Sequence, residues 1–361
     1  MSTRMQVRAK TTPTRGRWRA TTVCLVAAAA LSLAACGQSL RDEGSSKAEQ
    51  KAGAGARPIT MASVFCVCFI GPYVAMKQGF FEREGVPVKK YVTTKGGADT
   101  FQALVSGDVD FGLSGLDAII RGQSKGLKVR SVGAVYPEFY ALTVRKGQAS
   151  SIRSIDDLKG HTVAISKIGS ASWAFLQFVL HGAGLKQGDV KILQLGGIDT
   201  IVAGLKSGKV DAAVTWEPGT AQVEDKGIGT TLVNVLRPAD HQKVLNSTSS
   251  LGMTLATQDA LIKKNPDLVR RVVRALNDAG AWIKSHSASE VADVVAPLAP
   301  GVDRQVLTDA VKASIPMQPS SAAIHQSAFQ ASATVLKDAG VIDTIPATND
   351  VFACEFATCV K

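Results

Sequence analysis

The sequence lacks the signatures of several protein classes. Only 20% of its 361 residues are charged, and after the first 36 residues no long apolar run follows that would predict a membrane-spanning helix. It has no P-loop, no HExxH pair and no nucleophile elbow, and its five histidines are scattered. We therefore expect no enzyme, no cofactor and no metal centre. A hydrophobic content of 45% excludes a disordered chain.

The positive charge is concentrated at the start of the chain. There are 41 Lys and Arg against 30 Asp and Glu, and six of the cations lie in residues 1–20 without an acid. Subtracting those six leaves 35 cations against 30 acids, a net charge of +5. The remainder has no stripe of Lys and Arg interleaved with aromatic residues, which excludes nucleic acid as a partner.

The first 36 residues have the order of a secretory signal. A basic stretch precedes an apolar run over residues 21–33, which is shorter than the roughly 20 residues of a spanning helix. The run ends in LAACG (33–37), which looks like a bacterial lipobox. We expect a signal peptide over residues 1–36, lipidation of Cys36 and a flexible tether over residues 37–57.

An internal repeat organises the rest of the chain. GGADT (96–100) recurs as GGIDT (196–200), and SGDVD (106–110) recurs as SGKVD (207–211). In each copy, paired glycines turn the chain after a strand, a short helix follows, and a glycine ends that helix in the left-handed conformation. Two copies are too few for a solenoid and predict two similar α/β lobes.

Alternating strands and helices agree with two such lobes. Strands are predicted at residues 59–65, 86–93, 109–113, 128–135, 140–144, 161–166, 191–195 and 210–215. Short helices between them imply mostly parallel sheets with helices on both faces. From Asn265, which caps a long helix with Pro266 at its first position, the pattern is helical towards the C-terminus.

Five segments carry a resemblance to a known family. They are GPYVAMKQGFFEREGV (71–86), ALVSGDVDF (103–111), DLKGHTVA (157–164), GKVDAAVTWEP (208–218) and NPDLV (265–269). Over about residues 58–300 the chain resembles the substrate-binding proteins of bacterial ABC importers, in the nitrate, sulfonate and taurine group that also contains thiamine-precursor synthase-like proteins. The resemblance implies the periplasmic binding protein type II fold, with two mixed, mostly parallel sheets flanked by helices and two crossover hinges.

The resemblance also implies an architecture and a function. Lobe 1 would comprise residues 58–145 and 246–361, lobe 2 residues 146–245, with hinges near 142–145 and 247–254. The protein would be a monomer that closes around a small organic or inorganic anion, such as a sulfonate, a nitrate-like ion or an aromatic acid. It would deliver this ligand to an ABC permease and ATPase while held by its lipid at the cell membrane or in the periplasm.

Two other functions stay open. Thiamine-pyrimidine synthases share the resemblance, so the alternatives include an enzyme on the same fold and a protein that binds a neutral pyrimidine. Those synthases use a cysteine cluster with His and Lys, whereas Cys66 and Cys68 have no His nearby in the sequence. The export signal also disfavours biosynthesis inside the cell. A ligand-sensing lipoprotein is the other alternative, because sensing uses the same closure.

The ligand is expected where strands end. In an open α/β sheet, ligands bind beyond the carboxyl ends of the strands. Ser114 and Ser170 each begin a helix, one in each lobe, which predicts an anion site, although either serine alone would read as an ordinary N-cap. Trp216 is a ligand platform or core packing, and Tyr140 and Phe139 are cleft wall or strand core. The predicted ligand-binding residues are Cys68, Phe69, Ser114, Gly115, Leu116, Tyr140, Lys167, Gly169, Ser170, Trp216 and Glu217.

Four cysteines remain after the signal and Cys36. An exported protein meets an oxidising compartment, so Cys66, Cys68, Cys354 and Cys359 are disulfide candidates. Either the last two close a tail loop, or two bridges tie the tail to the cleft. A thiolate site for zinc or copper(I) is the alternative, but the spacing does not match a zinc ribbon. If free, Cys66 and Cys68 would lie at the cleft.

Overall fold

A computed structural model describes residues 57–245, 252–319, 324–357 and 359–360 of the chain. The expected signal peptide, Cys36 and the tether up to residue 56 lie outside these described residues. Within them, no helix combines the length and the apolar character needed to cross a membrane.

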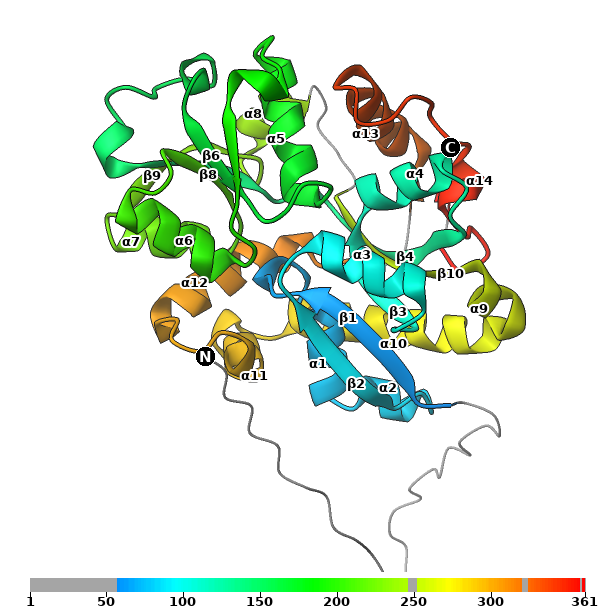
Figure 1. Ribbon diagram of the computed structural model, residues 1–361. Helices are drawn as coiled ribbons and strands as arrows, with labels where there is room; N and C mark the ends of the chain where they lie inside the picture. Colours follow the sequence, from blue (N-terminus) through cyan, green and yellow to red (C-terminus); the bar gives the residue numbers. More distant parts are fainter. Residues whose placement is uncertain (1–56, 246–251, 320–323, 358, 361) are drawn as a thin grey trace, which may run out of the picture. The chain divides into compact units, whose positions relative to one another are not determined.

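The first sheet has the strand order β2-β1-β3-β10-β4. β1 pairs in parallel with β2 and β3, whereas β10 runs antiparallel between β3 and β4, so every strand except β10 has the same direction. Its strands are β1 (Ile59–Val64), β2 (Val88–Thr94), β3 (Phe111–Gly115), β4 (Val129–Tyr136) and β10 (Met253–Gln258). Helices flank the sheet (Figure 1), among them α1 (Gly71–Lys77), α2 (Phe80–Arg83), α3 (Gly97–Ser106), α4 (Leu116–Ser124) and α9 (Asp259–Lys264).

The second sheet repeats this topology, with the order β7-β6-β8-β5-β9. β6 is parallel to β7 and β8, and β5 runs antiparallel between β8 and β9. The strands are β5 (Ala141–Arg145), β6 (Thr162–Ile165), β7 (Lys191–Gln194), β8 (Ala212–Thr215) and β9 (Gly229–Asn234). Helices of this half of the chain are α5 (Ala171–Gly182), α6 (Ile198–Ser207), α7 (Gly219–Asp225) and α8 (Pro238–Leu245).

In each sheet the antiparallel strand is the one that the chain enters from the other sheet. β5 follows β4 of the first sheet through residues 137–140, and β10 follows the helices of the second sheet. The structure therefore places residues 142–145, where a hinge is expected, inside β5, and the chain leaves the first sheet before Ala141. Most of the expected return hinge, residues 246–251, lies outside the described residues.

The repeated SGxVD segments perform the same structural task in both halves. α3 ends at Gly107 (φ 81°) and α6 at Gly208 (φ 75°), both left-handed as predicted. The aspartate that follows then fixes the start of the neighbouring strand: Asp110 Oδ2 accepts a hydrogen bond from the Thr60 amide at 2.8 Å, and Asp211 Oδ2 accepts one from the Thr162 amide at 3.0 Å. The repeat thus joins a helix end to the start of a parallel strand, β1 in the first sheet and β6 in the second.

These hydrogen bonds shift the acidity of both aspartates. Burial alone would raise the pKa of Asp110, but hydrogen bonds from Arg57 and Thr60 outweigh it and lower the pKa below its usual value. Burial is likewise outweighed at Asp211, where the Thr162 amide, His161 and Arg145 hold the pKa low. Both carboxylates are therefore stabilised in their charged form by the fold.

Helices dominate the chain after β10. α10 (Pro266–Ser285) begins as predicted, with Pro266 in its first turn and the Asn265 side chain accepting from the Leu268 amide at 3.1 Å. It is followed by α11 (Ala288–Val295), α12 (Arg304–Ser314), α13 (Gln326–Asp338) and α14 (Thr348–Val351). A short parallel pair, β11 (Ile324–His325) with β12 (Cys359–Val360), was not predicted. Two residues are too few for a periodic pattern to reveal a strand.

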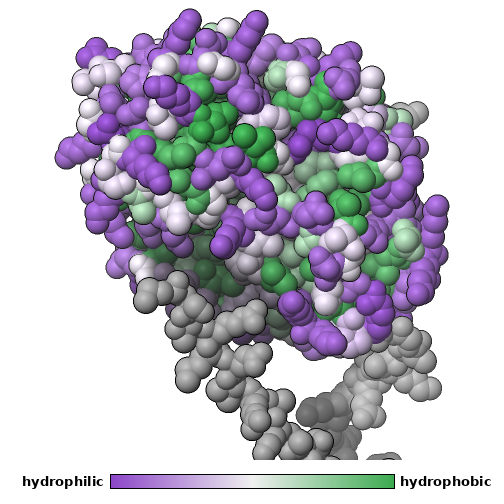
Figure 2. Space-filling model, in the orientation of Figure 1, coloured by the Kyte–Doolittle hydropathy of each residue, from purple (hydrophilic) through white to green (hydrophobic). Residues whose placement is uncertain are grey.

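The surface is mixed in character. On the face shown in Figure 2, hydrophobic patches alternate with hydrophilic side chains. Among the described residues, Ile168 and Val360 are the large hydrophobic side chains that are exposed, at 48% and 37%. Ile168 lies in the loop between β6 and α5, one of the strand-end loops where ligand is expected.

Replacing the repeated aspartates is expected to destabilise the fold equally in both halves. Asp110→Asn and Asp211→Asn should each lower the free energy of unfolding by about 1–3 kcal/mol at pH 7 in urea titrations. Because the folded-state pKa is depressed, this loss should be present above the unfolded pKa near 4 and disappear as the pH falls through the folded pKa. Asp108→Asn, at an exposed neighbouring position, is the control. If Asp108→Asn lowered the free energy of unfolding by the same amount, the structural role assigned to Asp110 and Asp211 would be contradicted.

Candidate functional site

The loops that follow β1 and β8 meet directly between the two sheets. The indole Nε1 of Trp216, just after β8, donates to the carbonyl oxygen of Phe65, just after β1, at 3.0 Å. The amide of Val67 donates to the carbonyl oxygen of Glu217 at 3.3 Å. The strand ends at which a ligand was expected are therefore in contact with each other.

Five aromatic side chains, which we call the aromatic chain, run through this junction. Ring centroids are 5.4 Å apart for Phe69 and Phe139, 4.6 Å for Phe139 and Tyr140, 5.6 Å for Tyr140 and Phe175, and 5.9 Å for Tyr140 and Trp216. All five are at most 5% exposed, and their spacings are those of favourable aromatic pairs. Phe69, Tyr140 and Trp216 were predicted at the site. Phe175, on α5, was not, because an apolar helix gives no signal for which of its rings faces a cleft.

Three hydroxyl groups converge at the start of α5, and we call them the serine cluster. Ser170 is the N-cap, and its Oγ accepts from the Trp173 amide at 3.4 Å. The Oγ atoms of Ser166, Ser170 and Ser172 lie 2.8–2.9 Å from one another, and all three side chains are buried. No acidic residue lies in the first turn of α5. Sequence reasoning selected Ser170 but not its two partners.

The start of α4 is different from that of α5. Ser114 is fully buried, and its Oγ has no hydrogen-bond partner among the described residues. However, the Leu116 amide donates to the Gly252 carbonyl at 2.8 Å, and Asp117 occupies the first turn. The positive end of α4 already faces a carboxylate, which is unlike the anion site expected at this helix start.

Two basic side chains cross between the halves, and both are paired with acids. Arg121 Nη2, on α4, donates to Asp117 Oδ2 at 2.9 Å and to the Gly169 carbonyl at 2.6 Å. Lys167 Nζ lies 2.9 Å from Asp99 Oδ1. The structure thus gives the predicted ligand cation, Lys167, an ion pair across the junction. The sequence did not reveal Arg121, because its partner in the other half, Gly169, is remote along the chain.

Two buried carboxyl groups at the junction, those of Glu138 and Glu217, have raised pKa values. Burial, with the negative charge of Asp117, raises the pKa of Glu138 to about 8. Burial raises the pKa of Glu217 to about 7 against the opposing effect of the Ala221 amide, which donates to its Oε2 at 3.1 Å. A small cavity beside Glu138 has room for about one water molecule. Its lining includes Leu116, Asp117, Glu138, Ala174, Ser332 and Leu336.

The four cysteines separate into two pairs. Cys354 and Cys359 form a disulfide with a Cα separation of 5.5 Å, whereas Cys66 and Cys68 are free and buried. The Cys68 amide donates to Cys66 Sγ at 3.1 Å, and burial raises the pKa of the Cys66 thiol. Within the described part of the chain, no group of three or more His, Cys, Asp or Glu is arranged to hold a metal.

Two sheets of the same topology, with crossover strands and meeting strand ends, define the periplasmic binding protein type II fold. The alkanesulfonate-binding protein SsuA from Xanthomonas axonopodis pv. citri, solved with bound MOPS, superimposes with a TM-score of 0.66 at 20% identity, covering 85% of this chain and 100% of that one. Such a likeness establishes the fold, and the predicted fold class is confirmed.

The chain belongs to the NMT1/THI5 like family, which matches residues 67–289. It is 30% identical over 250 residues to a Bacillus subtilis (strain 168) protein assigned to the binding of aliphatic sulfonates, covering 68% of this chain and 70% of that protein. It is 28% identical over 224 residues to the riboflavin-binding protein RibY of Chloroflexus aurantiacus (strain ATCC 29366 / DSM 635 / J-10-fl), covering 60% and 59%. The family resemblance predicted from the sequence is therefore confirmed, and these relatives are binding proteins.

The buried Glu138 is expected to make stability depend on pH. Its folded pKa of about 8 exceeds the usual value of 4.5, so its stabilising effect is complete below pH 4.5 and is lost as the pH rises through 8. From about pH 5 to about pH 8.5, the unfolding free energy should fall in the wild type and fall less in Glu138→Gln. Urea midpoints at successive pH values measure this, with the exposed Glu82→Gln as control. Parallel profiles for Glu138→Gln and the wild type would contradict it.

Proposed function

We propose that this protein is an extracytoplasmic solute-binding lipoprotein of an ABC importer, which captures a small organic acid between its two lobes. The observation that carries the proposal is that the serine cluster follows β6 and Trp216 of the aromatic chain follows β8, the neighbouring parallel strand. Closing the lobes around a ligand would bring donors from α5 and rings from both halves onto it. The ligand then passes to a permease and ATPase.

The serine cluster would bind the acid group of the ligand. A sulfonate or carboxylate needs several hydrogen-bond donors and a positive potential, and the start of a helix supplies both. α5 is 12 residues long, its first turn carries no acid, and its three serine hydroxyls satisfy one another in the structure. A hydroxyl that turned towards an oxyanion would exchange one of these serine–serine hydrogen bonds for a hydrogen bond to the ligand. The start of α4, with Asp117, does not offer the same potential.

The aromatic chain accounts for the organic part of the ligand. Trp216 and Tyr140 lie at adjacent strand ends, because Ala141 of β5 pairs with Thr215 of β8. Their faces offer apolar contact that a nitrate-like ion would not use. We therefore favour a sulfonate or carboxylate with an aromatic or alkyl body over a small inorganic ion.

A neutral heterocycle is the second candidate, and the carboxyl groups support it. Glu217, with a pKa of about 7, is partly protonated at neutral pH and can both donate and accept a hydrogen bond. Such a paired interaction suits a ring with adjacent N–H and acceptor atoms. One relative is a riboflavin-binding protein, which agrees with a heterocyclic ligand.

Export and anchoring complete the proposal. The basic and apolar order of residues 1–36 supports secretion, and Cys36 supports a lipid anchor. A monomer held in this way at the cell membrane or in the periplasm collects its ligand outside the cytoplasm. Capture needs only closure and release of the lobes, so no catalytic residue is assigned.

A thermal-shift screen of the protein against aryl and alkyl sulfonates, aromatic carboxylates, nitrate and pyrimidines tests the ligand class. A true ligand at one hundred times its dissociation constant should add roughly 2.7 kcal/mol of stability. Calorimetry should then show that Trp216→Ala and Ser170→Ala each weaken binding about tenfold or more, through lost stacking and lost donors.

Two matched variants act as controls. Trp282→Ala removes a tryptophan from α10, outside the aromatic chain, and Ser287→Ala removes the serine N-cap of α11. Neither should change affinity. A pyrimidine that binds where every acid fails would select the second candidate. Binding that is equally strong in Trp216→Ala and Ser170→Ala would overturn the site.

A further inference from the structure

Helix α13 lies beyond residues 67–289, the part that matches the family. It contacts α4, which follows β3 of the first sheet, and also α5 and α8 of the second half. Figure 1 shows it beside α4 and α5. Its Ser332 and Leu336 line the small cavity with Leu116 and Ala174, so one helix contributes to a space bounded by both halves.

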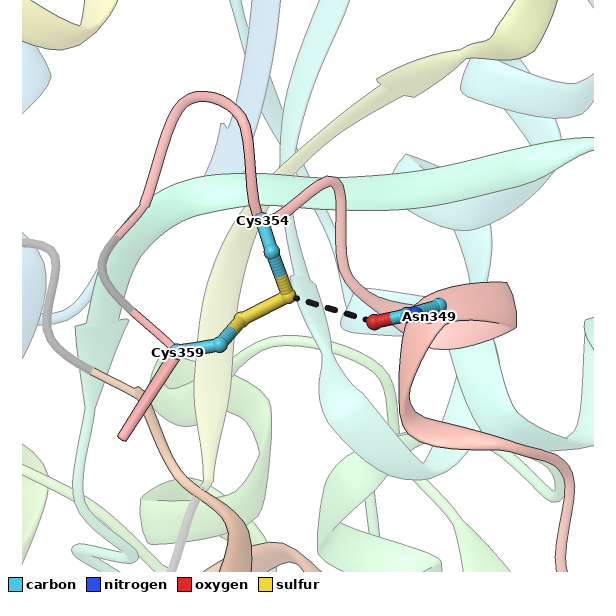
Figure 3. The surroundings of a disulfide bond; sticks show 3 residues. All are labelled: Asn349, Cys354 and Cys359. Carbon is cyan, nitrogen blue, oxygen red and sulfur yellow. Dashed lines mark hydrogen bonds between the residues drawn. A yellow bond between two sulfur atoms is a disulfide. The ribbon is translucent and has the colours of Figure 1, made fainter. Parts of the chain in front are cut away.

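The start of α13 is held by the C-terminal disulfide loop. Ile324 of β11, two residues before the helix, pairs with Cys359 of β12. Cys359 is bonded to Cys354, and Figure 3 shows this disulfide with Asn349 Oδ1 3.6 Å from Cys354 Sγ. The covalent bond therefore fixes the strand against which the segment before α13 is paired.

The disulfide loop is itself attached to the first sheet. The Ala353 amide donates to the Ser131 carbonyl of β4 at 2.8 Å, and Phe352 forms a bridge with the same residue. Phe352 also packs against Phe329 of α13, with ring centroids 5.4 Å apart and nearly perpendicular planes. Arg270 of α10 lies over the Phe356 ring at 5.4 Å.

We propose that α13 is a strap that holds the two lobes together, and that the Cys354–Cys359 disulfide sets its anchorage and so makes closure sensitive to redox conditions. That this closure holds a ligand rests on the proposed function. A dithiol reductant would give up two electrons and two protons, becoming a disulfide itself, while Cys354 and Cys359 become thiols. Both cysteines are partly exposed, which gives such a reductant access.

Once the disulfide is reduced, β12 is no longer cross-linked to Cys354 and is joined to the loop on β4 by the backbone alone. The two-residue pairing of β12 with β11 is weak without this cross-link, and the contact of Phe352 with Phe329 is then the other link between the loop and α13. The start of α13 is expected to open more often, and its contacts with α5 and α8 should loosen with it.

The test uses two readouts that need no ligand. Hydrogen exchange of α13 amides reports its anchorage, and peptide-resolved alkylation of the buried Cys66 and Cys68 reports opening of the junction. The purified protein is compared with Cys354→Ser/Cys359→Ser and with the wild type in a phosphine reductant. Leu336→Ala, which weakens α13 packing without touching the disulfide, is a further variant, and the exposed Lys337→Ala is its matched control.

In the double variant and the reduced wild type, the hydrogen-exchange rate of α13 and the alkylation rate of Cys66 and Cys68 should each rise about fivefold or more. The reason is that local opening costs less free energy. Leu336→Ala should raise alkylation, and Lys337→Ala should not. Unchanged α13 exchange would overturn the anchorage, and raised exchange with unchanged alkylation would overturn the strap. Hydrogen exchange of the β3 amides must stay slow in every variant. Slow exchange there shows that α13 has loosened without unfolding of the first sheet. None of these outcomes depends on which ligand binds, so failure of the proposed function is detected separately in the ligand screen.

Discussion

The hydrogen bond from the Trp216 indole to the Phe65 carbonyl joins the two loops on which the rest of the junction depends. Because these loops follow β8 and β1, the bond brings the strand ends of the two sheets into contact. The aromatic chain then packs continuously from Phe69 to Trp216. Arg121 and Lys167 add polar links on the side of α5. Ligand capture, as proposed, exchanges some of these contacts for contacts with the ligand.

Closure also explains the electrostatics of the junction. Contact between the halves removes water from Glu138 and Glu217, which raises the pKa of both carboxyl groups. The basic side chains that cross the junction are neutralised by Asp117 and Asp99. An acid ligand would therefore be held by hydroxyl and amide dipoles rather than by a salt bridge. The start of α5 has no acid in its first turn, whereas the start of α4 has Asp117, so the electrostatic potential is more positive at the α5 side of the cleft.

Sequence reasoning predicted the features that local patterns encode. The repeated SGxVD segments revealed two similar lobes, and the Asn265–Pro266 pair marked the start of α10. It missed β9, α7 and α8, whose short segments carry weak periodicity. Partners remote in the chain were also beyond its reach: Arg121 with Gly169, and Phe175 with Tyr140. Such pairings depend on how two sheets meet, which no single segment specifies. The Cys354–Cys359 disulfide was one of the two arrangements that the sequence left open.

A crystal structure of the protein with the ligand selected by the thermal-shift screen tests the central claim most directly. The account predicts density between the two sheets, with the polar group of the ligand on Ser166, Ser170 and Ser172 and its body against Trp216 and Tyr140. Residues from both halves should contact the same molecule. A ligand bound to one half alone, or away from the serine cluster and the aromatic chain, would contradict it.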